Sequence, residues 1–87
     1  MSSKIKIDIN ESQRSCLINY VCDMKITAIV EAGKKLSSDK YRIYPTWEEL
    51  EEMISALQLL AVKAEYQSTR QKLEKLAEYL EEHLVDV

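Results

Sequence analysis

Few side chains in this 87-residue chain could do catalytic chemistry, and their spacing does not bring them together. Cys16 and Cys22 are six residues apart, which on a helix places them about 240° apart around the axis. His83 is the one histidine and there is no CxxC pair, so the sequence predicts neither a zinc site nor a Cys–His catalytic pair. We expect two reduced, mostly buried thiols and no disulfide.

Carboxylates occur in two groups that could attract a divalent cation. The members of these groups are Glu48, Glu49, Glu51, Glu52, Glu78, Glu81 and Glu82. Calcium sites also need loop carbonyls and turn glycines, and Gly33 is the chain's one glycine. No phosphate-binding loop or Ser-His-Asp set is present either. We therefore expect solvated acidic faces, no metal, no cofactor, no small-molecule ligand and no enzymatic activity.

The aromatic residues Tyr41, Tyr44 and Trp47 cluster around Pro45. Aromatic side chains with a polar end are common anchors in protein interfaces, which makes this edge a candidate protein contact. The alternative is that the three rings seal a β-ribbon against the helices.

Charge is distributed unevenly along the chain, whose net charge is −3. Residues 1–44 hold eight basic and five acidic residues, a balance of +3, and residues 45–87 hold four basic and ten acidic residues, a balance of −6. This asymmetry could orient a partner, or it could be two solvated faces. Because the sequence has neither a span of ~20 apolar residues nor the apolar core of a secretory signal, we expect a cytoplasmic protein without a membrane role.

The first half of the chain predicts a strand followed by helix. Residues 4–9 alternate polar and apolar types, which predicts a half-buried strand with its isoleucines facing inward. Asn10 and Gln13 form a capping-box pattern for the helix that follows. Asp23 could cap a second helix, or residues 11–36 could form one helix; we favour the break. Gly33 is the expected end of this helical region, with Lys34 and Lys35 at the negative end of its dipole.

Residues 41–44 form a short β-prone run that Pro45 stops. A lone strand cannot satisfy its backbone groups, so we expect residues 41–44 to pair with residues 4–9 in a two-stranded ribbon.

The second half of the chain predicts helices with wide apolar stripes. Thr46 and Glu49 form a capping box, and an apolar stripe follows at spacings of three and four residues. Leu59 and Val62 widen this stripe, which predicts a helix buried on more than one side. A second stripe over residues 73–84 predicts a closing helix and a further contact surface. We favour a hairpin that breaks near residues 67–69, and the alternative is one helix over 47–84, which would need a partner along its length.

The order strand–helix–helix in the first 36 residues is similar to ribbon-helix-helix repressors, whose strands enter the DNA major groove as a dimer. The similarity implies that the outward residues Lys4 and Lys6 face bases and that Lys34 and Lys35 contact phosphates. Asp8 would be unfavourable in the groove, and the acidic second half would have to serve a partner.

A broader resemblance covers most of the chain. The segments Ile9-Asn10-Glu11-x-Gln13-Arg14, Tyr41 to Glu51 and Leu73-Glu74-Lys75-Leu76 are similar to a group of small uncharacterised bacterial helical domains with a short β-ribbon. The resemblance implies a helical hairpin over residues 47–84 and no particular activity.

These patterns predict a mainly α fold (α+β) in one small domain over residues 1–87, with three or four bundled helices and a ribbon of residues 4–9 and 41–44. The function that we expect is a non-enzymatic protein-interaction or self-association module, with a protein partner or a homodimer. The alternative is a dimeric DNA-binding regulator of ribbon-helix-helix type.

Overall fold

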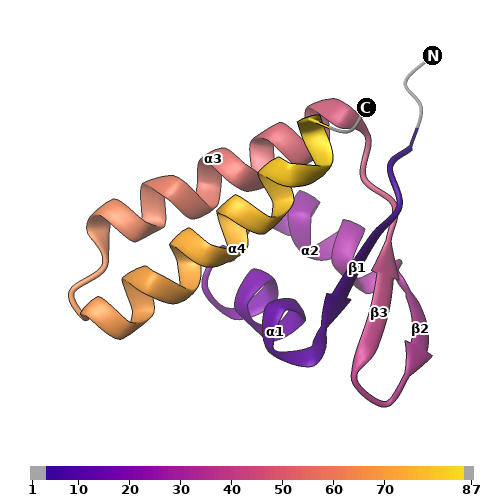
Figure 1. Cartoon of the computed structure of the whole chain (residues 1–87), viewed down its shortest axis with the longest axis horizontal. Coiled ribbons are helices and arrows are strands. Elements are labelled where there is room, and N and C mark those ends of the chain that lie inside the picture. The colour runs from indigo at the N-terminus through magenta and orange to yellow at the C-terminus, as the bar shows by residue number, and fades with distance from the viewer. Residues whose placement is uncertain (1–3, 86–87) are drawn as a thin grey trace.

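The computed structural model describes residues 4–85 and has four helices and a three-stranded antiparallel sheet (Figure 1). The elements in chain order are β1 (Ile7–Asn10), α1 (Glu11–Asn19), α2 (Met24–Glu31), β2 (Lys34–Ser37), β3 (Lys40–Ile43), α3 (Trp47–Lys63) and α4 (Gln67–Val85). The prediction of a mainly α fold with a small β part is confirmed.

The sheet has three strands in the order β1-β3-β2. The prediction of a two-stranded ribbon therefore lacked one strand. Ile7 pairs with Ile43 and Ile9 pairs with Tyr41, so the two predicted segments do pair, although the strands cover residues 7–10 and 40–43 in place of 4–9 and 41–44. Lys4 forms an isolated bridge with Thr46 ahead of the strand. The missed strand is β2, in which Lys34 pairs with Arg42.

Gly33 explains why residues 34 and 35 form a strand instead of a helix end. A Cβ atom at this position would lie 2.9 Å from the Arg42 carbonyl oxygen and 2.9 Å from Ile43 Cγ2. The missing side chain lets the backbone approach β3 closely, and β2 then pairs with the second edge of that strand. Leu36 therefore lies on an edge strand, 39% exposed, and not on a helix.

The first helical region is two helices, as favoured from the sequence. The Asp23 carboxylate accepts hydrogen bonds from the N–H groups of Lys25 at 2.9 Å and Ile26 at 3.2 Å, which caps α2. Just before it, Cys22 takes the left-handed backbone conformation with φ 51°. The chain turns there and starts a new helix axis.

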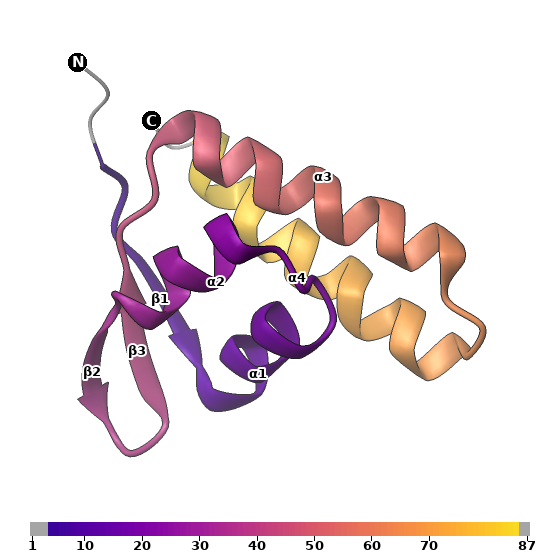
Figure 2. The same cartoon turned by 180° about the vertical axis from the view of Figure 1, so that it is seen from behind.

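Helices α3 and α4 form the expected hairpin, and the single helix over residues 47–84 is wrong (Figure 2). The break falls at residues 64–66, ahead of the predicted 67–69. Ala64 has extended backbone, with ψ 132°, and the Arg70 side chain donates from Nε to the Ala61 carbonyl at 3.1 Å. An arginine from the next helix thus satisfies a carbonyl at the end of α3, a role that local patterns do not reveal.

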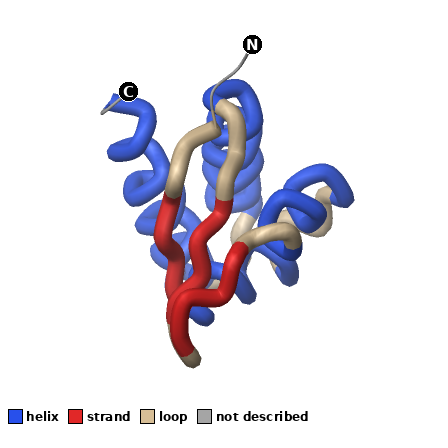
Figure 3. The backbone as a smooth tube through the Cα atoms, turned by 90° about the vertical axis from the view of Figure 1, so that its right-hand side faces the viewer, coloured by secondary structure: helices blue, strands red, loops and turns tan. Residues whose placement is uncertain are grey.

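One hydrophobic core lies between the sheet and the helices, and it draws buried residues from β1, β3 and all four helices. The strands contribute Ile7, Ile9 and Ile43, and α3 contributes Leu50, Met53 and Leu57. Leu73, Leu76 and Leu80 of α4 are at most 3% exposed, so the predicted contact stripe of the last helix belongs to the core instead. Figure 3 looks onto the sheet, and no helix lies in front of its strands.

Candidate interaction surfaces

The end of the α3–α4 hairpin carries an exposed apolar patch. Thr46 and Glu49 form the capping box that begins α3, with bonds of 2.8 and 3.1 Å between them. This register turns Leu50, Leu57 and Ala61 into the core, so Leu59 and Val62 point away from it.

Leu59 is 57% exposed, Val62 is 75% exposed, and Tyr66 in the following connection is 70% exposed. We call these three residues the hairpin-end patch.

A shallow hollow of about 310 Å³ adjoins this patch between α3 and α4. Its lining includes Ala61, Val62, Arg70 and Glu74. Arg70 is held there because its guanidinium also reaches the Ala64 carbonyl, 3.5 Å from Nη2. The patch therefore has a fixed polar rim on the α4 side.

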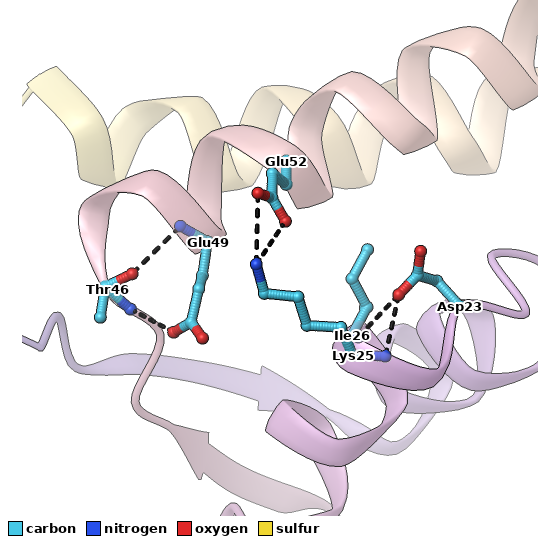
Figure 4. A network of polar contacts seen from close by, with 6 residues as sticks. All are labelled: Asp23, Lys25, Ile26, Thr46, Glu49 and Glu52. Atoms are coloured by element: carbon cyan, nitrogen blue, oxygen red, sulfur yellow. Dashed lines mark hydrogen bonds and ion pairs between the residues drawn. The ribbon is translucent and has the colours of Figure 1, made fainter.

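An acidic hollow of about 550 Å³ lies near the start of α3. Asp23, Glu48, Glu51 and Glu52 line it, together with Ile26, Ser55 and Ala56. Lys25 reaches Glu52, with Nζ 3.1 Å from Oε2, and ties α2 to α3 (Figure 4). The remaining carboxylates leave the hollow with an excess of negative charge.

The three predicted aromatic contacts do not share one surface. Tyr41 faces the helices, with the Arg14 guanidinium 4.8 Å and the Lys35 ammonium 5.8 Å from its ring centre. Tyr44 lines a different hollow with Lys4 and α2, and Trp47 is 41% exposed at the start of α3. Their role as protein contacts stays a prediction. Tyr41 and Tyr44 lie on opposite sides of the sheet, so one partner surface could not contact both.

The four lysines predicted to contact DNA lie on two opposite sides of the sheet. Lys4, Lys6 and Lys34 are exposed and lie on the outer side of the sheet by strand alternation and register. Lys35, one residue further along β2, lies on the inner side over the Tyr41 ring. On the outer side Arg42 binds Asp8 with two hydrogen bonds, 2.6 Å from Nε and 3.2 Å from Nη2.

This bidentate contact with Arg42 lowers the pKa of the Asp8 carboxyl below its ordinary value.

The free edge of β1 is occupied by side chains from within the chain. The Tyr79 hydroxyl of α4 donates to the Asp8 carbonyl, and the Gln13 side chain accepts from the Asn10 N–H at 2.8 Å. A ribbon-helix-helix dimer pairs this strand with its copy in a second chain, and that pairing would have to displace both bonds.

The titratable groups with catalytic potential stay apart. His83 Nδ1 lies 3.0 Å from the Tyr79 carbonyl, one turn earlier on α4. Cys16 is buried, which raises its thiol pKa, whereas Cys22 is exposed, contrary to the expectation of two mostly buried thiols. Among residues 4–85 no three His, Cys, Asp or Glu side chains are grouped so that they could hold a metal ion.

The sequence does not indicate the hairpin-end patch as a site, because Leu59 and Val62 widen an apolar stripe that predicts a helix buried on more than one side. The structure shows both residues exposed. The width of the apolar arc on α3 was the available signal. Whether a wide arc meets a second helix or solvent depends on tertiary packing, which the periodicity of one helix does not contain.

The chain matches no protein-family model, no curated protein and no solved structure. In the part of the chain that the structure describes, no helix is both long enough and apolar enough to cross a membrane.

Proposed function

We propose that this protein is a non-enzymatic interaction module that self-associates through the hairpin-end patch. The observation that carries the proposal is the exposure of Leu59, Val62 and Tyr66, each more than half accessible. Leu59 and Val62 are one turn apart on one helix face. Exposed apolar residues that are grouped, unlike those scattered singly, are typical of protein contact sites.

A second copy of the chain is the partner that the charges favour. The exposed side of α3 begins with Glu48, Glu51 and Glu52 and ends with Lys63. A two-fold antiparallel pairing brings Leu59 against Val62 of the second copy and keeps the acidic first turns of the two α3 helices at opposite ends of the contact. A parallel pairing would set like charges side by side.

The affinity should be modest because the patch is small. Interfaces at the low end of buried area are usually transient. We therefore expect a dissociation constant between about 10 μM and 1 mM.

Sedimentation equilibrium across a dilution series tests this proposal. Val62→Glu should raise the dimer dissociation constant at least tenfold, about 1.4 kcal/mol, because it buries a charge in the apolar contact. Val62 is 75% exposed, so the variant should keep its fold, which circular dichroism checks.

Leu36→Glu is the matched control, since it places the same charge at an exposed apolar residue on β2. Wild-type monomer at every concentration, or equal weakening by both variants, would contradict the proposal.

The geometry favours this function over the ribbon-helix-helix alternative. A dimer through β1 needs a free strand edge, and the Tyr79 hydroxyl and Gln13 side chain bind that edge. A dimer through the hairpin end leaves those bonds intact.

A further inference from the structure

The outer face of the sheet gathers cationic side chains from three segments of the chain. Asp8 pairs with Arg42, and Lys4 pairs with Thr46 in the same register, joined by the hydrogen bond from Ile5 N to the Pro45 carbonyl at 2.7 Å. This register places Lys6 opposite Tyr44. Because alternate residues share a face, Lys4, Lys6, Asp8, Arg42 and Tyr44 all lie on the outer side.

The neighbouring strand adds to this face. Lys34 of β2 is paired with Arg42, and Lys40 lies two residues before Arg42 on β3. We call Lys4, Lys6, Lys34, Lys40 and Arg42 the cationic face. Asp8 is the acidic residue among these outward positions, and Arg42 engages it.

The four lysines of the cationic face are exposed, and none of them forms an ion pair with another described residue. Same-face residues repeat every ~6.6–6.8 Å along a strand, and strands are ~4.8 Å apart. The face therefore presents a closely spaced array of positive charge, in a chain whose net charge is −3.

Apart from Asp8, most of the acidic residues of the described chain belong to α3 and α4. The helices lie behind the sheet in Figure 3. This separation gives the molecule a positive sheet side and a negative helical side. A polyanion is attracted to the sheet side and repelled from the other, which fixes the orientation of its approach.

A hollow of about 470 Å³ adjoins the cationic face where β3 ends. Tyr44 and Lys4 line it together with Ala28, Ile29 and Ala32 of α2. Glu49 also lines it, but its carboxylate accepts from the Thr46 N–H at 2.8 Å. A half-buried tyrosine beside small apolar side chains is suited to stack with a planar ring.

From this arrangement we infer that the cationic face binds single-stranded nucleic acid, with its lysines on the phosphates and Tyr44 against a base. The evenly spaced phosphates of a nucleic acid strand match the array of positive charges. Stacking on Tyr44 requires a base whose face is accessible, as in a single strand. A lipid surface fits less well because the three strands expose one large apolar side chain, Leu36 at 39%. A duplex groove fits less well because the major groove admits an α-helix or a two-stranded ribbon, and the cationic face lies on a three-stranded sheet.

Fluorescence anisotropy with a labelled mixed-sequence DNA strand of about 12 nucleotides tests this inference. Wild type should bind with an affinity that falls as salt rises. Lys6→Ala with Lys34→Ala should weaken binding at least tenfold and reduce the log–log salt slope by about 1.4, which is about 0.7 for each lost phosphate contact. Tyr44→Ala should weaken binding at least fivefold with the salt slope unchanged, because stacking releases no counterions.

Lys72→Ala with Lys75→Ala removes the same charge from exposed positions on α4 and should leave binding unchanged. Equal weakening by this control would mean that net charge alone drives association and would overturn the inference. So would an absence of salt-dependent binding, or tighter binding to the matching duplex, to polyglutamate or to anionic phospholipid vesicles. Val62→Glu should bind the strand like wild type, which separates this site from self-association.

Discussion

At the scale of single residues, Gly33 has the clearest structural role. A methyl group there would stand 2.9 Å from the Arg42 carbonyl oxygen and 3.0 Å from the Val30 carbonyl oxygen. Because one atom belongs to the backbone of strand β3 and the other to the backbone of helix α2, Gly33→Ala should destabilise the fold by about 1–3 kcal/mol. Urea unfolding measures this difference. Ser38→Ala in the exposed turn between β2 and β3 is the control and should change stability by less than about 0.5 kcal/mol; an equally stable Gly33→Ala variant would contradict the close packing.

The Asp8–Arg42 pair gives the stability a pH dependence on the acid side. Arg42 holds the Asp8 pKa below its ordinary 3.8, so the folded state favours the carboxylate. The resulting stabilisation is present above pH 3.8 and is lost as the pH falls through the lower folded-state pKa. The effect should be small because the Arg42 and Asp8 side chains are 35% and 44% exposed.

Urea unfolding of Asp8→Asn from pH 7 to strongly acidic conditions measures this contribution. The variant should be less stable than wild type at neutral pH, and the difference should shrink in acid. Glu78→Gln, which removes an exposed carboxylate on α4, should follow wild type throughout. A difference that does not change with pH would rule out the linkage.

At the scale of elements, Tyr79 joins α4 to β1 through its hydroxyl and the Asp8 carbonyl. Tyr79→Phe removes that donor and leaves a partly buried carbonyl without its partner, so the free energy of unfolding should fall by about 1 kcal/mol. Amide hydrogen exchange should also quicken in β1. Tyr20→Phe, at a tyrosine 44% exposed, is the matched control. Unchanged exchange in β1 would show that the hydroxyl does not hold this edge.

Elements with local end signals were predictable, and elements defined by distant contacts were not. The capping residues Asn10, Asp23 and Thr46 each begin a helix where the sequence indicated, because a cap acts on its own backbone. β2 was missed because its pairing depends on the close approach at Gly33 and on an open edge of β3. The end of α3 was misplaced because Arg70, nine residues away, satisfies the Ala61 carbonyl.

In the candidate sites, too, features set by local sequence were predictable and features set by distant contacts were not. Strand alternation correctly separated inward isoleucines from outward Lys4 and Lys6, since it is a local property. Tyr41 and Tyr44 were grouped because both lie close to Pro45 in the sequence, although residues three apart in and after a strand face opposite sides. The exposure of Leu59 and Val62 depends on which helices pack against α3, so a single helical stripe could not reveal it.

At the scale of the whole molecule, the two proposed surfaces lie at different ends. The hairpin-end patch lies at the tip that extends beyond α1 and α2, and the sheet lies at the opposite end (Figures 1 and 2). A dimer through the hairpin tips would therefore leave both sheets accessible. Such a dimer should bind a long nucleic acid strand more tightly than the monomer does, because the second contact becomes intramolecular.

This coupling is testable with strands of two lengths. Val62→Glu should reduce affinity for a strand long enough to reach both sheets, while its affinity for the short strand stays at the wild-type value. Titrations above the dimer dissociation constant measure both affinities. Equal affinities of wild type and variant for the long strand would show that the two surfaces act independently.

The most direct test of self-association through the hairpin-end patch is the concentration dependence of the amide NMR spectrum. Between concentrations above and below the dimer dissociation constant, signals of residues 55–66 should shift together along one dilution curve. Signals of β1, β2 and β3 should stay in place. A spectrum that does not change with concentration, or one whose shifts fall on the strands instead, would contradict the account.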